Sequence, residues 1–261
     1  MNGFERRALG GGGHALVSLS LERAGFLAAF AERTGGSSAA PFHSLNVSFS
    51  VGDDPDAVAA NRRRVIQAFD MASFAVPGLV HGTTILPVGP ARAGDGFRGP
   101  ADLLRAADGL HTKRAGLPLA GFSADCVIAM MAAPTEGRVA LVHAGWRGMG
   151  AGILQRAASL FRDRGQVMVA IGPAIGPCHY EVGEDVVGAV AAASPAGAVT
   201  ERRSGRLYLD LVATTGAILG EMGIRQVEDT GLCTACEGGR FFSYRQEGST
   251  GRHLALAMKL A

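Results

Sequence analysis

The sequence predicts an α+β fold with mixed sheets in a single domain. The 261 residues are enough to build one large hydrophobic core, and 48% of them are hydrophobic. Short apolar segments typical of buried strands alternate only partly with amphipathic helices, so a regular doubly wound sheet is not expected. No internal repeat or linker divides the sequence. We therefore expect residues 1–13, which end in the glycine run Gly10–Gly13, to form a flexible arm and residues 14–261 to form one domain.

The composition excludes several classes of protein. The 38 glycines have no period, which rules out a collagen-like repeat and indicates many tight turns. The formal net charge of +2 leaves no basic stripe of the kind that nucleic-acid binders carry. The apolar segments are too short to cross a bilayer, and the N-terminus lacks the apolar core of a signal peptide. We expect a cytoplasmic protein with no nucleic-acid or membrane partner and with reduced cysteines; the sequence does not predict its oligomeric state.

In the first half of the chain, the pattern predicts several strands and one capped helix. Strands are expected at residues 14–19, 45–50 and 77–88, and either a helix or a strand at 23–32. Asp53 or Asp54 is expected to cap a helix over residues 56–70. Residues 90–114 are rich in glycine, alanine and charge, so we expect an irregular surface excursion there.

The second half of the chain is more regular. Expected strands lie at residues 127–132, 138–142, 167–171, 207–209, 241–244 and 253–259. Expected helices lie at residues 152–164, 184–193 and 211–222, and Asp210 is expected to cap the last of them.

Three potential metal ligands, His81, Cys126 and His143, are expected next to strand ends. Cys126 precedes one apolar strand and His143 ends the next, so a hairpin can bring the two side by side. Zinc accepts imidazole nitrogen and thiolate sulfur, and three protein ligands leave the fourth tetrahedral position open, as in catalytic sites. Spacing alone is a weak signal, because most single Cys or His residues at strand ends are structural. For His81 the spacing provides no geometric argument.

A glycine-rich loop follows His143, in the segment His143-Ala-Gly-Trp-Arg-Gly-Met-Gly-Ala-Gly-Ile153. An apolar strand runs through this loop into a helix, whose free N–H groups could form an anion site together with Arg147. The order of the glycines is not that of a dinucleotide-binding fingerprint. A tight turn with close strand–helix packing is an equally good interpretation.

The other cysteines and histidines carry weaker signals. Cys233 and Cys236 form a CxxC motif without a second pair or a thioredoxin-like context, so a zinc knuckle or a redox role is a minor alternative. Cys178 and His179 lie in a glycine/proline turn, which indicates a structural role. The remaining histidines are interpreted as ordinary polar residues, although His111 could approach a substrate; they are His14, His43, His111 and His253.

A series of motifs along nearly the whole chain resembles one known family. The motifs include, in order, Leu45-Asn-Val-Ser, Asn61-Arg62, Val80-His-Gly82, Ala124-Asp-Cys126, His143-Ala-Gly-Trp-Arg-Gly148, Ile171-Gly-Pro-Ala-Ile175, Phe241-Phe-Ser-Tyr-Arg245 and Thr250-Gly-Arg252. They are similar to those of the multicopper polyphenol oxidoreductase, or laccase-domain, family, which is also described as a family of purine nucleoside phosphorylases. This chain departs from the family pattern at Leu79 and Ile128, where Gln and Pro are usual, and neither change removes a ligand.

The resemblance implies a layered α/β/β/α fold like that of toxin-type cysteine hydrolases. It places the family's metal ligands on His81, Cys126 and His143, which would also be catalytic, with zinc as the metal and copper possible in the same site. It implies phosphorolysis of adenosine, inosine and S-methyl-5′-thioadenosine to the free base and (methylthio)ribose 1-phosphate, with deamination of adenosine. Purine nucleosides and phosphate would be the partners.

Four further residues are candidates within such a site. Arg62 and Arg147 are candidates for holding phosphate, because guanidinium groups bind such anions through paired hydrogen bonds. Asn46 is a candidate for contacting base or ribose. Asp125, next to the Cys ligand, is a candidate catalytic residue, either as a proton carrier or by orienting that ligand. A buried structural pair of an arginine and a carboxylate is an equally good interpretation of the charged candidates. The sequence leaves the roles of Cys178, His111 and Arg245 open.

Three other functions remain as alternatives. A copper-dependent, laccase-like polyphenol oxidase normally needs roughly ten histidines around several coppers. This chain has seven histidines and no His-x-His pair, which argues against that chemistry. A hydrolase or amidase acting on cell-wall precursors would use Cys126 as nucleophile with a histidine base. A non-enzymatic binding protein is the third alternative.

Overall fold

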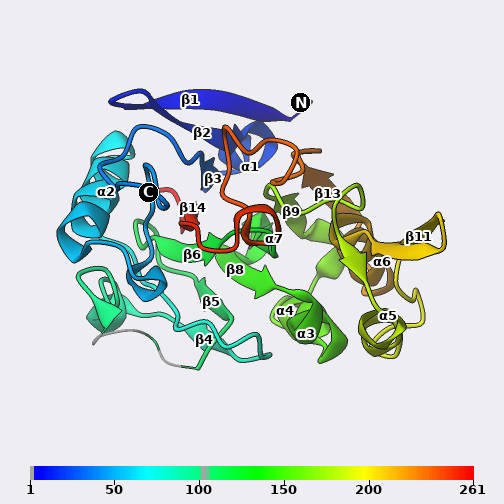
Figure 1. Cartoon of the computed structure of the whole chain (residues 1–261). Coiled ribbons are helices and arrows are strands. Elements are labelled where there is room, and N and C mark those ends of the chain that lie inside the picture. Colours follow the sequence, from blue (N-terminus) through cyan, green and yellow to red (C-terminus); the bar gives the residue numbers. More distant parts are fainter. Residues whose placement is uncertain (1–2, 101–103, 105) are drawn as a thin grey trace.

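Two large sheets form the centre of the molecule (Figure 1). The computed structural model describes residues 3–100, 104 and 106–261. One sheet is antiparallel throughout and has the order β1 (Phe4–Gly10), β2 (Gly13–Ser18), β3 (Phe26–Ala31), β14 (His253–Lys259), β6 (Leu119–Ser123). The other is mixed and has the order β13 (Gln226–Asp229), β9 (Met168–Ile171), β7 (Val127–Ala133), β8 (Arg138–Ala144), β5 (Gly109–Thr112), β4 (Ile85–Pro87). Only its two outermost pairs, β13–β9 and β4–β5, are parallel.

The two sheets pack face to face, and alternation along their strands divides the core into layers. In β7, Ile128 and Met130 face the five-stranded sheet, whereas Val127 and Ala129 face the helices on the other side. Strand β14 behaves in the same way, with its alternate side chains in the core between the sheets and in the outer core. Both strands are therefore apolar along nearly their whole length, which is the pattern that made them recognisable in the sequence.

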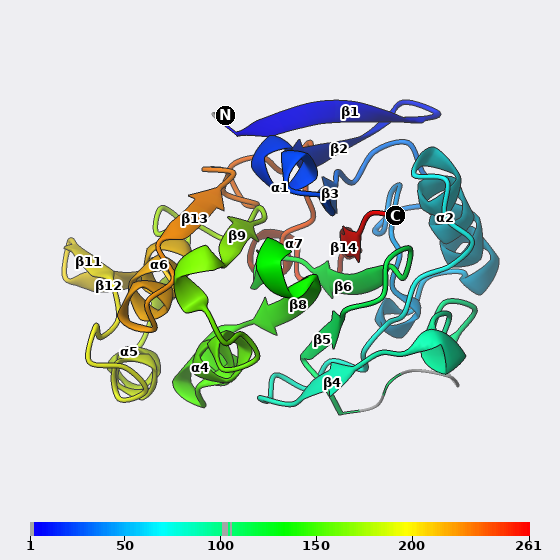
Figure 2. The same ribbon diagram turned by 180° about the vertical axis from the view of Figure 1, so that it is seen from behind.

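Helices cover the two outer faces of the sheets. Helix α2 (Pro55–Ala68) packs Val65 and Ile66 on the five-stranded sheet. The six-stranded sheet is covered by helices on the opposite side of the molecule (Figures 1 and 2). These are α3 (Trp146–Gly150), α4 (Ile153–Ala158), α5 (Glu184–Ala191) and α6 (Leu211–Glu221). The predicted α+β fold with layers in the order α/β/β/α is confirmed.

The remaining elements are short. They are the helices α1 (Leu19–Arg23) and α7 (Tyr244–Glu247), the 3-10 helices η1 (Phe49–Val51), η2 (Pro90–Arg92), η4 (Pro134–Glu136) and η5 (Arg164–Gln166), and a small sheet of β10 (Glu181–Val182), β12 (Arg206–Leu209) and β11 (Thr200–Arg203). None of the helices in the described part of the chain combines the length and apolar character that a membrane crossing requires.

Side-chain caps and one hairpin explain the elements that position the site. The Asp54 carboxylate accepts a hydrogen bond from the N–H of Asp56 at 2.9 Å, and Pro55 occupies the first turn of α2. Strands β7 and β8 form a hairpin that turns through η4. Its register places Ile128 opposite His143, so Cys126 and His143 lie at the same end of the sheet.

The N-terminal residues correct the prediction of a flexible arm over 1–13. Residues 4–10 form strand β1, which pairs with β2 from Phe4 opposite Ser18 to Ala8 opposite His14. The glycine run is the turn of this hairpin, because Gly11 and Gly12 have positive φ. Glycines that look like a linker in the sequence therefore connect two strands of the main sheet.

Several elements differ from the sequence-based prediction in type or in length. Residues 45–50 contain no strand but lead into η1, and residues 241–244 run into α7. Helix α4 ends at Ala158 and not at 164, and β4 covers only the end of the strand expected at 77–88. The excursion expected at 90–114 contains η2 and β5, and its residues 101–103 and 105 lie outside the described part.

Candidate metal centre

His81, Cys126 and His143 come together at one end of the six-stranded sheet. One ligand atom from each lies within 4.8 Å of the others. The two imidazole rings meet edge to face, with ring centroids 4.9 Å apart. Tetrahedral zinc with one sulfur and two nitrogen ligands separates these atoms by about 3.3 to 3.6 Å, so small side-chain movements would complete the coordination.

A buried carboxylate, that of Asp108, holds both histidines in place. Its Oδ1 accepts hydrogen bonds from His143 Nδ1 at 3.0 Å and from the His81 backbone N–H at 2.8 Å. Its Oδ2 accepts from the N–H of Gly82 at 2.7 Å. Because Nδ1 of His143 is engaged, its Nε2 is the nitrogen left for a metal. The bonds to the backbone also hold His81 at a φ of +58°, a left-handed conformation that is uncommon for a residue with a side chain.

The buried thiol and imidazole of the site influence each other strongly. Burial by itself would raise the pKa of Cys126, but the charge and hydrogen bonds of His143, with help from His81, lower it to about 6. Burial likewise opposes protonation of His143, yet the Cys126 thiolate and the Asp108 carboxylate raise its pKa to about 9. At neutral pH the metal-free site therefore holds a thiolate next to an imidazolium, and the thiolate is already in the form that binds a metal.

The backbone leaves room for these ligands. A Cβ atom at Gly145 would lie 2.9 Å from the Cys126 sulfur and 3.1 Å from Cδ2 of His81. Only glycine fits between the two side chains at this start of α3. The glycine-rich loop after β8 thus makes space for the ligand set.

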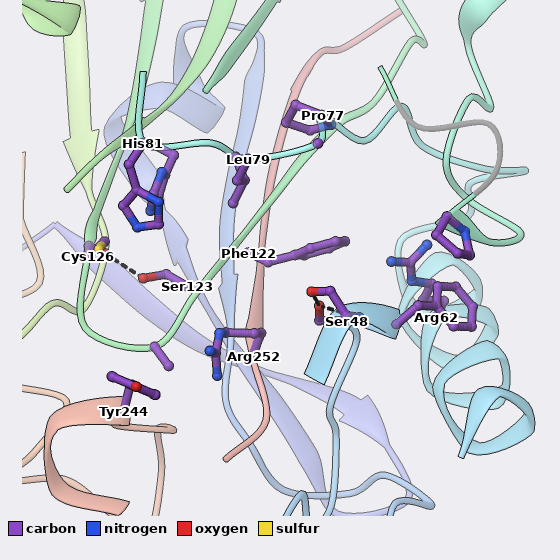
Figure 3. Close-up of a pocket in the computed structure, with 16 residues that line it drawn as sticks. Ser48, Arg62, Pro77, Leu79, His81, Phe122, Ser123, Cys126, Tyr244 and Arg252 are labelled. Atoms are coloured by element: carbon purple, nitrogen blue, oxygen red, sulfur yellow. Dashed lines mark hydrogen bonds between the residues drawn. The ribbon is translucent and has the colours of Figure 1, made fainter. Parts of the chain in front are cut away.

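A cavity of about 530 Å³ opens directly beside the three ligands (Figure 3). This volume is within the usual range for a site that binds a small molecule. Phe122, Leu79 and Pro77 form an apolar part of its wall, and Arg252 and Tyr244 lie across from the ligands. Ser48 and Ser50 add hydroxyl groups, which lie 2.8 Å apart. The cavity can therefore receive a flat apolar ring and a polar or anionic group together.

Arg62 lies at the far end of the cavity from the metal ligands. Its guanidinium donates to the backbone carbonyls of Val47, Gly96 and Phe97 at 2.6 to 2.9 Å. It also stacks near the rings of Phe49 and Phe122. Burial lowers its pKa to about 9. These contacts give Arg62 a role in building the cavity wall.

Asn46 is fully buried and is not among the residues that line the cavity. Its Oδ1 accepts from the N–H groups of Ser48 at 3.1 Å and Arg252 at 2.9 Å. Its Nδ2 donates to Asp53 at 2.8 Å and to the Ser48 carbonyl. Asn46 thus connects the backbones of two residues that line the cavity, Ser48 and Arg252.

Asp125 precedes the Cys ligand in a left-handed conformation with φ of +102°. Its carboxylate accepts hydrogen bonds from the Thr234 hydroxyl at 2.6 Å and from the Arg245 N–H at 2.7 Å. Its carbonyl accepts from the N–H of Ile175 at 2.9 Å. Two loops and the start of α7 therefore hold Asp125, which lies outside the cavity next to Cys126.

Two other residues noted in the sequence also lie away from the cavity. Arg147 is exposed and stacks on Trp146, with 4.3 Å between its guanidinium carbon and the ring centroid. His111 contacts Arg138 at 2.9 Å, and burial together with the Arg138 charge lowers its pKa to about 4. Neither is among the residues that line the cavity in the described part of the chain.

Sequence reasoning missed Asp108 and Arg252 as functional residues. Asp108 lies in the stretch interpreted as an irregular excursion, although an acidic residue just before the apolar strand β5 was an available signal. Arg252 was seen only as part of a motif. Nothing in the linear pattern reveals that the start of β14 lies beside β6, where Arg252 reaches the cavity.

Comparison with known proteins identifies the family. The sequence profile of the family described as multi-copper polyphenol oxidoreductase laccase matches residues 27–259. The chain belongs to this laccase-domain family. It is 38% identical over 245 residues to purine nucleoside phosphorylase YlmD of Geobacillus stearothermophilus, covering 89% of each chain. It is 34% identical over 231 residues to purine nucleoside phosphorylase YfiH of Escherichia coli, covering 87% of this chain and 91% of that one.

Two solved crystal structures have the same fold. The crystal structure of YlmD from Geobacillus stearothermophilus matches with a TM-score of 0.88 and 36% identity over 95% of this chain and 96% of that one. The crystal structure of the Bacillus licheniformis hypothetical protein YfiH matches over the whole of both chains, with a TM-score of 0.90 and 30% identity. The chain is therefore an enzyme-family member whose curated relatives are named purine nucleoside phosphorylases.

Proposed function

We propose that this protein is a zinc-dependent purine nucleoside enzyme. Its proposed reactions are phosphorolysis of adenosine, inosine and S-methyl-5′-thioadenosine to the free base and (methylthio)ribose 1-phosphate, and deamination of adenosine. The observation that carries the proposal is a His-Cys-His ligand set that opens onto a cavity of small-molecule size. The names of the curated relatives support the choice of substrate.

The donor chemistry of the site fits zinc. One thiolate and two imidazoles suit zinc, and an open fourth position is typical of catalytic zinc. Copper can bind the same donors, but among the described residues only one group of potential ligands lines the cavity, whereas multicopper oxidases use several coppers. When bound, zinc supplies a Lewis acid that polarises an oxygen atom or acidifies a water molecule. We propose His81, Cys126 and His143 as the residues that hold it.

In phosphorolysis, a phosphate oxygen forms a bond to C1′ of the ribose while the bond from C1′ to the base nitrogen breaks. The electron pair of that bond stays on the base, which takes up a proton. We propose that Arg252 binds the phosphate, because it lies in the cavity wall opposite the metal ligands. Phe122 offers its ring to the purine, and the apolar wall excludes water that would otherwise compete with phosphate.

In deamination, a water oxygen bonds to C6 of adenine and the amino group leaves as ammonia. The same cavity serves both reactions if the purine can present either C6 or the ribose to the metal end. Asp108 keeps its place in either case, because its carboxylate accepts hydrogen bonds from His143 and from the backbone N–H groups of residues 80–82 and does not reach the cavity. Asp125 acts by orienting Cys126.

Incubation of the purified protein with adenosine, with and without inorganic phosphate, tests the proposal. Adenine that appears only with phosphate identifies a phosphorylase, and inosine identifies a deaminase. Metal analysis of protein made without added copper checks the cofactor. A protein that forms neither product, or one that oxidises phenols with stoichiometric copper bound, would refute the assignment.

One observation favours a second function, a cysteine hydrolase. Cys126, His143 and Asp108 form a Cys-His-Asp series in which the thiol pKa is lowered and the carboxylate orients the imidazole. An amidase acting on cell-wall precursors would use such a series without a metal. Treatment with a chelator and, separately, with a thiol alkylator distinguishes the two functions. If the chelator leaves activity intact while the alkylator abolishes it, the hydrolase is correct and the zinc enzyme is not.

A further inference from the structure

A second cluster of potential metal ligands lies outside the cavity, at the surface, in the loops that follow β9 and β13. It contains Cys178, His179, Cys233 and Cys236, whose ligand atoms all lie within 4.8 Å of one another. Cys178 and His179 come from the loop after β9, and the CxxC motif of Cys233 and Cys236 comes from the loop after β13. The fold thus brings together two motifs that lie more than fifty residues apart in the sequence.

We propose that a structural zinc site is formed by Cys178, His179, Cys233 and Cys236. This site is separate from the one proposed at His81, Cys126 and His143. The site ties together the two loops that hold Asp125 beside Cys126. Three thiolates and one imidazole make a complete tetrahedral set, with no position left for a substrate, which is the composition of structural zinc sites.

The distances within the cluster match a tetrahedron around zinc. Nδ1 of His179 lies 3.3 Å from the Cys178 sulfur, 3.4 Å from the Cys236 sulfur and 3.9 Å from the Cys233 sulfur. The sulfurs of Cys178 and Cys236 are 3.4 Å apart. Zinc bound at usual lengths separates such ligands by about 3.5 to 3.8 Å. The same histidine nitrogen therefore faces all three sulfurs at nearly the required spacing.

The backbone around the cluster is shaped for thiolates. The N–H of Gly176 donates to the Cys233 sulfur at 3.2 Å, as a hydrogen bond to a metal-bound thiolate would. A Cβ atom at Gly176 would lie 3.3 Å from the Cys178 sulfur, so a side chain there would press on the ligands. Glu237 closes the CxxC turn by donating its N–H to the Cys233 carbonyl at 3.0 Å.

The cluster is linked directly to the candidate active site. Ala174 and Cys233 form a parallel β-bridge, which joins the two loops next to the cluster. Thr234, inside the CxxC motif, donates its hydroxyl to Asp125, and Ile175 donates its N–H to the Asp125 carbonyl. A zinc ion at the cluster would thus fix both loops that orient the residue before Cys126.

Binding of zinc at this site is a proton exchange and involves no redox step. The three thiols lose their protons to the solvent, the neutral imidazole of His179 contributes its Nδ1 lone pair, and the oxidation states do not change. A disulfide between Cys178 and Cys236 is the competing use of the same atoms. It would need an external oxidant, and all four cysteines are free in the structure.

The number of metal ions per chain tests the proposal. The protein is stripped of metal, kept reduced, reloaded with Zn²⁺ and freed of excess metal on a desalting column. Wild-type protein is expected to retain two zinc ions per chain. Cys236→Ser and Cys126→Ser are a matched pair: each removes one thiolate, one from each site, and each variant is expected to retain one ion. One ion in the wild type and none in Cys126→Ser would overturn the proposal.

Cobalt distinguishes the two sites independently of activity. Co²⁺ in the Cys126→Ser protein would have three thiolate ligands, so its sulfur-to-metal absorption should be much stronger per cobalt than in the Cys236→Ser protein. A chelator should also lower the melting temperature of Cys126→Ser, because its one remaining ion ties the loops together. Equal, weak absorption in both variants contradicts the proposal. A second result would also contradict the proposal: mass spectrometry finds a disulfide between Cys178 and Cys236, and the protein takes up no zinc at this cluster after the disulfide is reduced.

Discussion

Asp108 contacts two of the three proposed metal ligands, His81 and His143. It is completely buried, and hydrogen bonds from His143 and from the backbone of Gly82 and His81 hold its pKa below the ordinary value despite its burial. A carboxylate behind a ligating histidine fixes the ring and increases its basicity. Here the same carboxylate also fixes the backbone that presents the second histidine, so one side chain controls two of the three ligands.

Replacement of Asp108 should therefore weaken the metal site without removing a ligand. For Asp108→Asn we expect about a 10- to 100-fold loss of zinc affinity at His81, Cys126 and His143, because the amide provides no negative charge and its NH2 group must face one of the N–H groups that now donate to the carboxylate. Competition with a chromophoric chelator measures the affinity. Asp163→Asn, an exposed substitution far from the site, is the control. Equal zinc affinity in both variants would show that Asp108 does not support the ligands.

The coupled pKa values of Cys126 and His143 predict how zinc binding depends on pH. The thiol, with its pKa lowered to about 6, is already ionised above that pH, whereas the imidazole, with its pKa raised to about 9, stays protonated below pH 9. Zinc should thus displace about one proton from this pair between pH 6 and 9 and about two from it below pH 6, so the contribution of the pair should lower the affinity about tenfold per pH unit between 9 and 6 and more steeply below.

Calorimetry in buffers of different ionisation enthalpy measures these protons. The Cys236→Ser variant is the suitable protein, because it removes a ligand of the second cluster. Proton release that stays constant from pH 5 to 9 would contradict the predicted thiolate–imidazolium pair.

Arg252 and Arg147 provide a matched test of where phosphate binds. Arg252 lines the cavity, whereas Arg147 is exposed and stacks on Trp146. For Arg252→Gln we expect the KM for phosphate to rise about 10- to 100-fold, since a hydrogen bond to a charged group contributes about 1.5–3 kcal/mol. Arg147→Gln should leave this KM unchanged. Zinc content shows whether either variant has lost the metal, and the opposite pattern of KM values would assign phosphate to the glycine-rich loop after β8.

At the scale of elements, caps and turns decide where helices and strands begin. Asp54 caps α2 and Asp210 caps α6, where its carboxylate accepts from the N–H of Ala213 at 2.8 Å. The sequence predicts Asp210 as one cap and either Asp53 or Asp54 as the other, because a capping carboxylate acts on an N–H only two or three residues away. Helix α4 was predicted too long, since the apolar pattern continues after Ala158 while the chain leaves the helix there.

The cap of α2 has a measurable contribution to stability. For Asp54→Ala we expect the free energy of unfolding to fall by about 1 kcal/mol, because the N–H of Asp56 loses its partner. Asp54→Asn keeps an accepting oxygen and should be nearly neutral. Urea denaturation followed by circular dichroism measures both variants. If Asp54→Asn were as destabilised as Asp54→Ala, the negative charge of Asp54 would contribute more to stability than its hydrogen bond with the N–H of Asp56.

At the scale of the whole molecule, single strands such as β7 contribute side chains both to the core between the sheets and to the core under the helices. We therefore expect the two sheets and their helices to unfold together. Met130 lies in the centre, between the sheets, with only 1% of its surface exposed. For Met130→Ala we expect a loss of about 2–5 kcal/mol, because the close-packed layer around it cannot collapse into the space left. Val199→Ala, at an exposed position, should change stability little.

Urea unfolding followed by circular dichroism and by fluorescence of Trp146, the single tryptophan, tests this expectation. Coincident transitions with both probes indicate one cooperative unit. Separate transitions would show that the layer containing the metal centre unfolds on its own.

The sequence by itself determined the features that depend on short-range chemistry. Alternating and continuous apolar runs identified β2, β7, β8, β9 and β14, and carboxylate caps identified α2 and α6. The hairpin between Cys126 and His143 could be inferred because the residues that join them form both strands and the turn. Motifs in a fixed order supplied His81 and the family.

Only the tertiary structure decided what depends on contacts between distant segments. Asp108 joins His81 to His143, Arg252 reaches the cavity at the start of β14, and Cys178 and His179 meet the CxxC motif. In the linear sequence each of these is an ordinary polar residue or a half-set of ligands, because its partner is chosen by the order of strands in the sheets. The strand order brings these groups within bonding distance, and that order follows from packing of the whole core and not from local pattern.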